Sequence, residues 1–435
     1  MKGNRTAIVV GTGAGGAMMA RELQGRYHVT LLEAGGAFKP FALPVNKLAG
    51  LRKTGLFLDE RMIQPLLPAM RVARTAGGGP SADMVMVWGR GVGGTTTLAT
   101  GNAVRCDGAL KEIGIDLDNA FESLYKELPI TTDHRSKWTG CTRRMWNVFE
   151  AMGLDPVVTP KFLDAHKCVG CGHCAIGCPT GAKWDTRALV DQAVAAGAEL
   201  VTNCRVTGLE IEGRRVRAVH AKLHGRPVSY TADLIVLAAG GLGTPVILER
   251  SGIPCEKTLF VDPVLCVAGP LKGFGQDWQL LMPFISQQDG YILSPYMDYL
   301  SFFFNRDWRL PMKDIASVMI KLADDEAGSV DGRRIDKRMS DRDNANLQRA
   351  VAQCREILKR LGVPEDRQFL GTLNAGHPGG MLPLTKAARD TLHDPRLPEN
   401  LYVADATILP KAMGNPPILT IMALAKKMAG MLQEQ

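Results

Sequence analysis

Residues 7–16 read AIVVGTGAGG, and this stretch decides how the rest of the chain is interpreted. A β-branched run ends at Gly11, and Gly11, Gly13 and Gly16 form the pattern G-x-G-x-x-G. The following AMMARELQ has the small and straight-chain residues of a helix. The next segment, HVTLLEAGG, reads as a second strand and contains Glu33, twenty residues past Gly13. Strand, glycine turn, helix, strand and acid in this order are the βαβ dinucleotide-binding fingerprint.

Each residue of the fingerprint has a physical task. Gly11 permits a tight turn, Gly13 lets the backbone approach a pyrophosphate, and Gly16 lets the helix pack close to the strand. The helix N-terminus offers N–H groups and a positive dipole end to phosphate. Glu33 can accept hydrogen bonds from a ribose 2′-OH and would repel a 2′-phosphate. The motif therefore predicts a bound dinucleotide, although it does not separate FAD from NAD.

The composition is that of a soluble globular protein. The 435 residues are 46% apolar and 22% charged, and the length suits two or three domains. The net charge of +8 is spread along the chain, so we expect a solvated surface and no nucleic-acid partner. No secretory signal precedes the first strand, and the longest apolar stretch, 233–248, is broken by glycine and proline. Ten cysteines, mostly single, do not resemble a disulfide scaffold, so we expect a cytoplasmic protein that is not itself a membrane protein.

Three further segments extend the fingerprint. Residues 88–102 read WGRGVGGTTTLATGN, a second glycine-rich loop with many hydroxyls. Residues 234–253 read LIVLAAGGLGTPVILERSGI, a buried strand followed by a glycine turn and a helix. Residues 401–429 read LYVADATILPKAMGNPPILTIMALAKKMA, which gives a strand, a turn at Asp405, a proline-rich bend and a C-terminal helix.

Together with the N-terminal motif, these segments resemble the glucose–methanol–choline (GMC) flavoprotein oxidoreductases. The resemblance covers roughly half the chain, and 255–370 matches no segment of that family. It implies that FAD is the cofactor, that the loop at 88–102 lies beside the isoalloxazine, that Asp405 lies near the pyrophosphate–ribityl region, and that Val206 lies near the adenine. The expected cofactor contacts are Gly11, Gly13, Gly16, Glu33, Arg90, Gly94, Thr95, Asn102, Val206, Asp405, Ala406 and Pro416.

The resemblance also implies a catalytic pair. The family uses a histidine in an H-x-x-G segment and a His or Asn in the C-terminal block, and here LNAGHPGGMLPL supplies His377 and GNPPILT supplies Asn415. A neutral imidazole can take the hydroxyl proton of an alcohol, and an amide can hold the alcohol oxygen. Asn415 could instead only cap the turn before Pro416. Gly380 is followed by MLPL, unlike the family pattern, so substrate contacts beyond His377 are not implied. The histidines at 28, 134, 166, 220, 224 and 393 read as surface or structural residues.

The stretch CVGCGHCAIGCP at 168–179 carries the second kind of chemistry. Cys168, Cys171, Cys174 and Cys178 have the spacing C-x2-C-x2-C-x3-C followed by proline, the bacterial ferredoxin run. Disulfides between such close thiols would be strained, and zinc modules usually separate two C-x-x-C pairs by a longer segment. An iron–sulfur cluster is therefore favoured, with Cys141 as an alternative remote ligand.

The cysteine segment resembles that of the FAD-dependent glucose and fructose dehydrogenase catalytic subunits. These enzymes hold a three-iron cluster with C-x5-C-x3-C, a spacing that Cys168, Cys174 and Cys178 match. Cys171 is then an extra thiol, and as a fourth ligand it would favour a 4Fe–4S over a 3Fe–4S cluster. The long-chain alcohol oxidases of the family also have a Cys/Gly-rich segment here, which keeps open a purely structural role.

The expected fold class is α/β: a Rossmann-like FAD-binding domain of the GMC type, a smaller α+β substrate domain built on an antiparallel sheet, and a cysteine-rich iron–sulfur insert. The FAD-binding domain is expected to be discontinuous. Aromatic residues concentrate in 270–310, where WQLLMPFI and YILSPYMDYLSFFF suggest strands, and 341–362 reads as an amphipathic helix that covers their sheet. The expected boundaries are 1–135, 185–254 and 371–435 for FAD binding, 136–184 for the cluster and 255–370 for the substrate.

The expected function is oxidation of an alcohol to a carbonyl by hydride transfer to FAD, with electrons leaving through the cluster to a redox protein or cytochrome. The aromatic region favours an apolar or cyclic substrate, although an ordinary sheet core explains it equally well. Two alternatives stay open. One is the reverse reaction, carbonyl reduction fed by the cluster; the other is an electron-transfer protein with no alcohol substrate.

Overall fold

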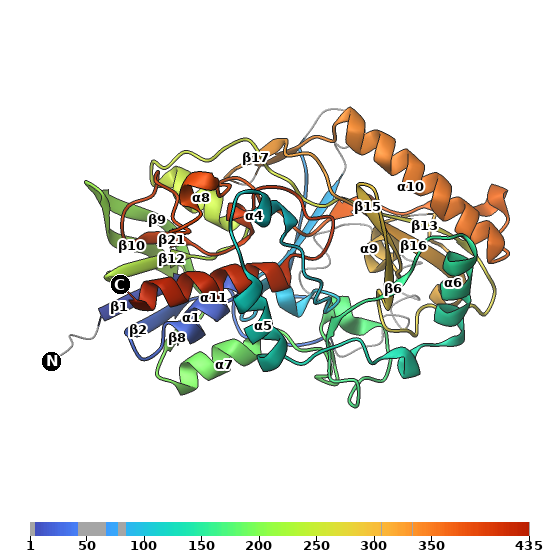
Figure 1. The fold of residues 1–435 in the computed structure, drawn as a ribbon, viewed down its shortest axis with the longest axis horizontal. Helices are drawn as coiled ribbons and strands as arrows, with labels where there is room; N and C mark the ends of the chain where they lie inside the picture. Colours follow the sequence, from blue (N-terminus) through green and yellow to red (C-terminus); the bar gives the residue numbers. More distant parts are fainter. Residues whose placement is uncertain (1–4, 42–66, 77–83, 306, 333, 435) are drawn as a thin grey trace.

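The structure is a computed structural model that describes residues 5–41, 67–76, 84–305, 307–332 and 334–434. Two large sheets lie toward opposite ends of its long axis (Figure 1). The N-terminal strands and the C-terminal helix belong to the same end; at the other end lie the strands β13 (Val264–Pro270), β15 (Tyr291–Pro295) and β16 (Ile315–Leu322) with helix α10 (Asp341–Arg360) (Figure 1). Among the described residues, no helix is long and apolar enough to span a bilayer.

The first sheet has the strand order β21-β12-β1-β2-β8, and all its pairings are parallel. Its strands are β1 (Arg5–Val10), β2 (Tyr27–Leu32), β8 (Glu199–Val201), β12 (Leu234–Leu237) and β21 (Leu401–Val403). Residues 7–10 of β1 and all of β12 are apolar and buried, as expected for a parallel sheet covered on both faces. The sheet therefore draws its strands from three separate parts of the chain.

The glycine turn has the predicted geometry. Gly11 has φ +97°, and a Cβ there would lie 2.3 Å from the carbonyl oxygen of Ala238. A Cβ on Gly16 would lie 2.0 Å from the oxygen of Gly11. Both positions exclude any side chain, so helix α1 (Ala14–Glu22) packs directly on the end of β1.

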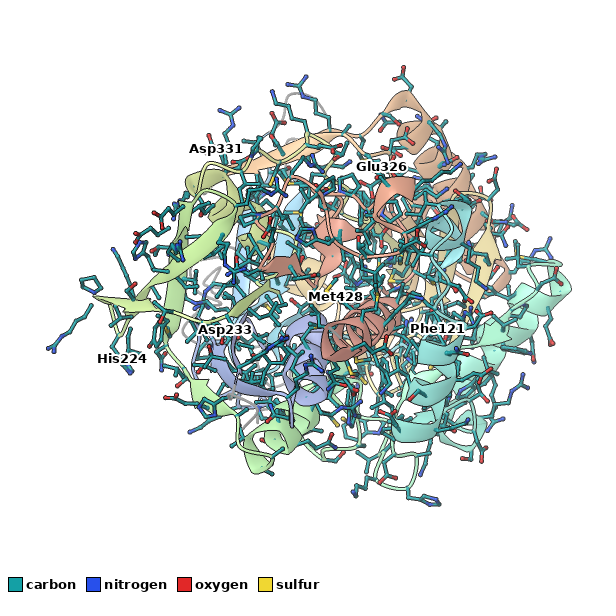
Figure 2. All side chains as sticks on the ribbon, turned by 60° about the vertical axis from the view of Figure 1, so that its left-hand side comes forward. Phe121, His224, Asp233, Glu326, Asp331 and Met428 are labelled. Atoms are coloured by element: carbon teal, nitrogen blue, oxygen red, sulfur yellow. The ribbon has the colours of Figure 1, made fainter. Side chains whose placement is uncertain are left out.

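Helices and a small sheet enclose the parallel sheet. Helix α1 packs against α7 (Arg187–Ala195) and the C-terminal α11 (Ile418–Glu434). An antiparallel sheet of β9 (Cys204–Glu212), β10 (Arg215–Leu223) and β11 (Arg226–Tyr230) contacts α8 (Gly243–Arg250). In Figure 2, Met428 of α11 lies inside the molecule, whereas His224 projects from the β10–β11 hairpin into solvent.

The second sheet is mixed and mainly antiparallel. Its core is β13 (Val264–Pro270), β16 (Ile315–Leu322), β15 (Tyr291–Pro295) and β14 (Phe284–Gln288). Strands β3 (Met70–Arg74), β4 (Val85–Gly89), β6 (Val157–Val158), β19 (Phe369–Leu370) and β20 (Asn374–Ala375) extend it. Helix α10 (Asp341–Arg360) starts at a capping box of Ser340 and Asp343 and packs on β13, β15 and β16, as the amphipathic pattern predicts.

Short elements connect these layers. They are α4 (Gly108–Glu112), α5 (Asp118–Glu127), α6 (Gly140–Ala151), β5 (Ile130–Thr131), β7 (Lys161–Phe162), β17 (Gly328–Asp331) and β18 (Arg334–Lys337). Helix α6 contacts α10, so the segment just before the cysteines is anchored to the second sheet.

Part of the strand expectation for 270–310 is wrong. The segments Phe284–Gln288 and Tyr291–Pro295 do form a hairpin, but Tyr299–Phe304 is a helix, α9. The carboxylate of Asp298 accepts the backbone N–H groups of Leu300 and Ser301, which caps the helix start. The stretch before residue 284, which includes WQLL, is irregular rather than extended. A local cap thus overrides the strand preference of the aromatic residues.

Candidate functional site

The two glycine-rich loops lie against each other. A Cβ on Gly94 would lie 3.0 Å from the Cα of Gly13, and the Thr12 hydroxyl accepts the Gly93 N–H at 3.0 Å. By contrast, a Cβ on Gly13 itself would meet no atom of the described residues within 4 Å. Open space thus adjoins Gly13 at the N-terminus of α1, where the fingerprint calls for a pyrophosphate.

Glu33 is buried and holds this loop together. Its carboxylate accepts the Thr12 hydroxyl at 2.7 Å and the N–H groups of Thr12 and Gly35 at 3.2 and 2.8 Å. Burial raises the pKa of Glu33 despite these bonds. Each carboxylate oxygen can accept more than one hydrogen bond, so contact with a ribose stays a prediction.

The other expected contacts of the second glycine loop make protein hydrogen bonds. The Arg90 guanidinium donates to the Ala34 carbonyl at 2.9 and 3.2 Å, which ties this loop to the end of β2. The Thr95 hydroxyl accepts the Gly89 N–H at 3.1 Å. Asn102 is buried, with its amide nitrogen 3.2 Å from the Met282 sulfur.

The remaining expected contacts come from separate elements. Val206 is a buried residue of β9. Asp405 accepts the Gly240 N–H at 2.8 Å and the Thr244 hydroxyl at 2.6 Å, so it joins the central glycine turn to the C-terminal block. The oxygen of Ala406 accepts the Gly380 N–H, and Pro416 is buried before α11. The structure thus brings the C-terminal block and the His377 segment together.

His377 lies beside a buried ion pair. Its Nδ1 is 3.3 Å from Oδ2 of Asp262, and the same oxygen is 2.5 Å from the Nζ of Lys321. Asp262 and Lys321 are almost fully buried, whereas 22% of the His377 side chain is accessible although the ring lies deep in the protein. The ring is therefore only partly accessible.

The electrostatics favour a neutral imidazole. Burial and the positive charge of Lys321 lower the pKa of His377, and these effects outweigh the opposing pull of Asp262. Burial would raise the pKa of Asp262, but Lys321 and His377 outweigh it and lower that pKa. Asp262 is therefore a carboxylate, and it can accept an Nδ1–H while Nε2 remains the basic nitrogen.

Asn415 is held in the same cluster. The other oxygen of Asp262, Oδ1, accepts the N–H of Gly414 at 3.2 Å, so one carboxylate contacts both His377 and the turn of Asn415. The Asn415 amide donates to Gln287 Oε1 at 3.0 Å. Within the described residues, the buried atoms Asn415 Oδ1 and His377 Nδ1 have no well-aligned hydrogen-bond partner. Unsatisfied buried polar atoms are uncommon in folded proteins.

The four cysteines of 168–178 line one cavity of about 300 Å³, a volume that includes space open to solvent. Its other walls include Leu163, Leu280 and Lys183. Cys141 is not part of this wall; it lies near Thr139 and Gln279. In the described ranges, no three His, Cys, Asp or Glu side chains are arranged to hold a metal ion. The structure therefore gathers the thiols but leaves the iron–sulfur expectation unsupported.

Two buried lysines separate the thiols from the second glycine loop. The Lys183 ammonium donates to the carbonyls of Thr96, Thr97 and Ala99 at 2.8–3.0 Å. The Lys161 ammonium donates to the Leu281 carbonyl at 2.6 Å and bonds Asn102. Burial lowers the pKa of Lys161 to about 7 and also lowers that of Lys183.

Sequence reasoning missed Asp262, Lys321, Lys161 and Lys183. A lone lysine or aspartate in a mixed segment normally predicts a solvated side chain. The Asp262 of VDPVL has a left-handed backbone conformation with φ +51°. Aspartate tolerates this conformation better than most residues, so an aspartate before proline was the one signal in the sequence. The six histidines interpreted as surface or structural residues behave as expected: those at 28, 166, 220 and 224 are exposed, that at 393 is half-buried, and His134 is buried with both ring nitrogens bonded.

Comparison with known proteins identifies the family. Residues 6–273 match the family model "GMC oxidoreductase", and residues 163–431 match "FAD dependent oxidoreductase". The chain is similar to an uncharacterised protein of Methanocaldococcus jannaschii, with 25% identity over 96% of this chain and 97% of that protein. It is also 25% identical to the long-chain-alcohol oxidase FAO1 of Arabidopsis thaliana, over 96% of this chain and 65% of that enzyme.

A solved structure supports the fold. The structure of pyridoxine 4-oxidase from Mesorbium loti superposes with a TM-score of 0.76 at 17% identity, over 99% of this chain and all of that one. The expected GMC-type α/β fold is thereby confirmed. Because one family model matches more than half of the chain and a second FAD-dependent model covers the rest of its core, the chain belongs to the GMC family of FAD-dependent oxidoreductases.

Proposed function

We propose that this chain is a dehydrogenase that oxidises an alcohol to a carbonyl and passes the electrons through an iron–sulfur cluster to an external acceptor. The observation that carries the alcohol reaction is the buried cluster of His377, Asp262 and Asn415. The carboxylate of Asp262 contacts both the His377 ring and the turn of Asn415, and the buried Oδ1 of Asn415 has no well-aligned partner among the described residues. These are the groups that a hydroxyl substrate requires: a base for its proton and an amide for its oxygen.

The residues around Gly13 fit FAD. The space beside Gly13, the exposed N–H groups at the start of α1 and the carboxylate of Glu33 match a pyrophosphate and a ribose. The loop of Arg90 to Asn102, Val206 and the Asp405–Pro416 block would form the rest of the site. When bound, FAD supplies the hydride acceptor.

In this proposal His377 accepts the hydroxyl proton of the substrate with the help of the residues around it. Asp262 accepts the Nδ1–H of His377, fixes the tautomer and leaves Nε2 to take the hydroxyl proton of the substrate. Lys321 keeps Asp262 ionised by its 2.5 Å contact. Asn415 holds the alcohol oxygen with its amide and so fixes which C–H bond faces the acceptor. The resulting imidazolium is stabilised by the neighbouring carboxylate.

The names of the relatives suggest the substrate class. A long-chain alcohol oxidase and a pyridoxine 4-oxidase both act on a hydroxyl carried by a largely apolar or cyclic molecule. The second sheet supplies the buried side chains of Phe284 and Tyr291, and helix α9 supplies that of Phe302. We therefore propose an apolar or ring-containing alcohol as the substrate.

The proposed iron–sulfur cluster rests on the spacing of the cysteines and on the cavity that they share. Cys168, Cys174 and Cys178 have the spacing of the sugar dehydrogenase subunits, and Cys171 lines the same cavity. A cluster with several irons holds its thiolates farther apart than one ion does, so it could fit where a single metal ion finds no site. Four thiols favour 4Fe–4S, with 3Fe–4S as the alternative.

The cavity lies within reach of a protein acceptor. Two exposed apolar side chains lie near the cysteines. Val169, between Cys168 and Cys171, is 56% exposed, and Trp278 is 52% exposed. The segment of Trp278 approaches the cysteine segment closely, because a Cβ on Gly172 would lie 2.9 Å from the oxygen of Asp277. Exposed apolar side chains beside a redox centre suit a docking redox protein or cytochrome.

Carbonyl reduction fed by the cluster uses the same groups in reverse and is the second candidate. The domain boundaries and a cytoplasmic location stay predictions.

Replacing Gly13 with Ala tests the cofactor site. The added methyl would meet no atom of the described residues, so the melting temperature of the FAD-free protein should be unchanged, while FAD retention after gel filtration should fall. The matched variant Gly11→Ala should lower both, because its methyl would lie 2.3 Å from a carbonyl oxygen. Full FAD occupancy in Gly13→Ala would place the pyrophosphate elsewhere.

Replacing His377 with Ala should slow flavin reduction by an alcohol roughly 10²–10⁴-fold, the usual contribution of a general base. Reduction by dithionite, which needs no base, should be unchanged and serves as the control. Alcohol reduction at the wild-type rate would remove His377 from the chemistry and favour the electron-transfer alternative.

The pH dependence tests Asp262. Flavin reduction should require neutral His377 and should therefore decline at acid pH with a midpoint below the ordinary histidine value of 6.5. Asp262→Asn removes the negative charge that favours the imidazolium, so the midpoint should move further down. Because this variant also leaves Lys321 buried without its partner, the double variant with Lys321→Met is the stable comparison. Identical profiles in the wild type and both variants would contradict the proposed pairing.

Metal analysis tests the cysteine site. We expect four irons and four sulfides per chain in anaerobically purified protein, and a loss of iron in Cys171→Ser and Cys178→Ser. Cys141→Ser should keep the wild-type content, because Cys141 lies outside the cavity wall. Three irons per chain would remove Cys171 from the ligand set, and zinc without sulfide would replace the redox role with a structural one.

A further inference from the structure

The thiol cavity adjoins two buried ammonium groups that lack carboxylate partners. Lys161 and Lys183 are 1% and 4% exposed. Among the described residues, the hydrogen bonds of either ammonium go to backbone carbonyls or to the Asn102 amide. Each nitrogen has three such oxygen acceptors, as many as an ammonium has N–H groups. Burial lowers the pKa of both lysines, and an anion beside them would restore the charged form.

The nearest acid does not supply that anion. Asp185 is close to Lys183, but its two carboxylate oxygens already receive the Arg187 guanidinium at 2.8 and 2.9 Å. The thiols are the other ionisable groups close to the lysines. Lys183 lines the same cavity as all four cysteines, and its backbone N–H donates to the Cys178 sulfur at 3.4 Å. Besides Asp185 and Arg187, the charge neighbours of Lys183 are Cys174 and Cys178; those of Lys161 are Cys174, Cys168 and Lys183.

We propose that Lys161 and Lys183 are the counter-charges of an anionic cluster held by the four cysteines and that they raise its reduction potential. This inference rests on the proposed iron–sulfur function. A cluster held by thiolates is an anion and becomes more anionic when it accepts an electron, so two fixed positive charges stabilise the reduced state. Water screens them poorly because both are buried.

The position of the lysines suggests why a raised cluster potential would matter for the proposed reaction. Lys183 bonds the carbonyls of residues 96–99, and Lys161 bonds Asn102 and the carbonyl of Thr100, so both are fixed to the loop expected beside the isoalloxazine. They thus connect the proposed cofactor loop with the surroundings of the thiols. Each turnover takes two electrons and two protons from the alcohol, and two one-electron acceptors carry the electrons away. A raised cluster potential favours that direction over carbonyl reduction.

The test is an anaerobic redox titration of the holoenzyme with dithionite, followed by EPR of the cluster. Lys161→Met and Lys183→Met should each shift the cluster midpoint to a more negative potential, and the double variant should shift it further. The matched control is Lys167→Met: this side chain neighbours Cys168 in sequence but is 65% exposed and pairs with Asp164 at 3.3 Å. Solvent screening should leave the potential of that variant near the wild-type value.

Arginine variants separate charge from folding. Lys161→Arg and Lys183→Arg keep the charge and should keep the cluster with a potential near that of the wild type. If the methionine variants lose iron while the arginine variants retain it, the positive charge is needed to hold the anionic cluster, as proposed. Methionine variants that keep the cluster at the wild-type potential, or loss of iron in the methionine and arginine variants alike, would overturn the role of the lysines. A wild-type protein without iron would instead refute the proposed cluster itself.

Discussion

The close contact between α1 and the end of β1 is the constraint on which the rest of the structure depends. Gly11 and Gly16 have no room for a side chain, and a Cβ on Gly15 would lie 1.5 Å from the oxygen of Ala404 in the C-terminal block. Helix α1 therefore packs closely on the N-terminal strand β1 and on the C-terminal block at Ala404. Its N-terminus, with unpaired N–H groups, faces the open space at Gly13, and the C-terminal residues that carry Asn415 are fixed relative to it.

Buried charge is the second organising feature, and it occurs in two forms. Asp262 with Lys321, and Asp324 with Lys337, are compensated pairs; the latter has a 2.7 Å contact and no exposure. Such pairs add little net stability to the fold, but removing one partner destabilises it strongly, so the pairs fix the relative positions of the segments that carry them. Near the thiols the compensation is missing from the protein itself. That contrast is the physical basis for placing an anionic group there and a proton-handling group at His377.

Much of the fold could be predicted from the sequence because its signals are local. The glycine fingerprint and the strand of Leu234–Leu237 depend on neighbours in sequence, and the amphipathic helix of Asp341–Arg360 depends on periodicity. The helix at Tyr299–Phe304 was missed because one cap, Asp298, decides it. The partners of His377 could not be predicted, because Asp262 and Lys321 are separated from it by 115 and 56 residues and meet it only through the second sheet. The lysines at the thiols were hidden for the same reason.

The most direct measurement is an anaerobic titration of the holoenzyme with a panel of apolar and cyclic alcohols, with flavin absorbance and cluster EPR recorded on the same samples. The account predicts that an alcohol that bleaches the flavin also produces the EPR signal of a reduced cluster, and that the matching carbonyl does neither. Flavin bleaching with no change in the cluster signal would contradict the proposed exit of electrons, and a panel that leaves the flavin oxidised would contradict alcohol oxidation itself.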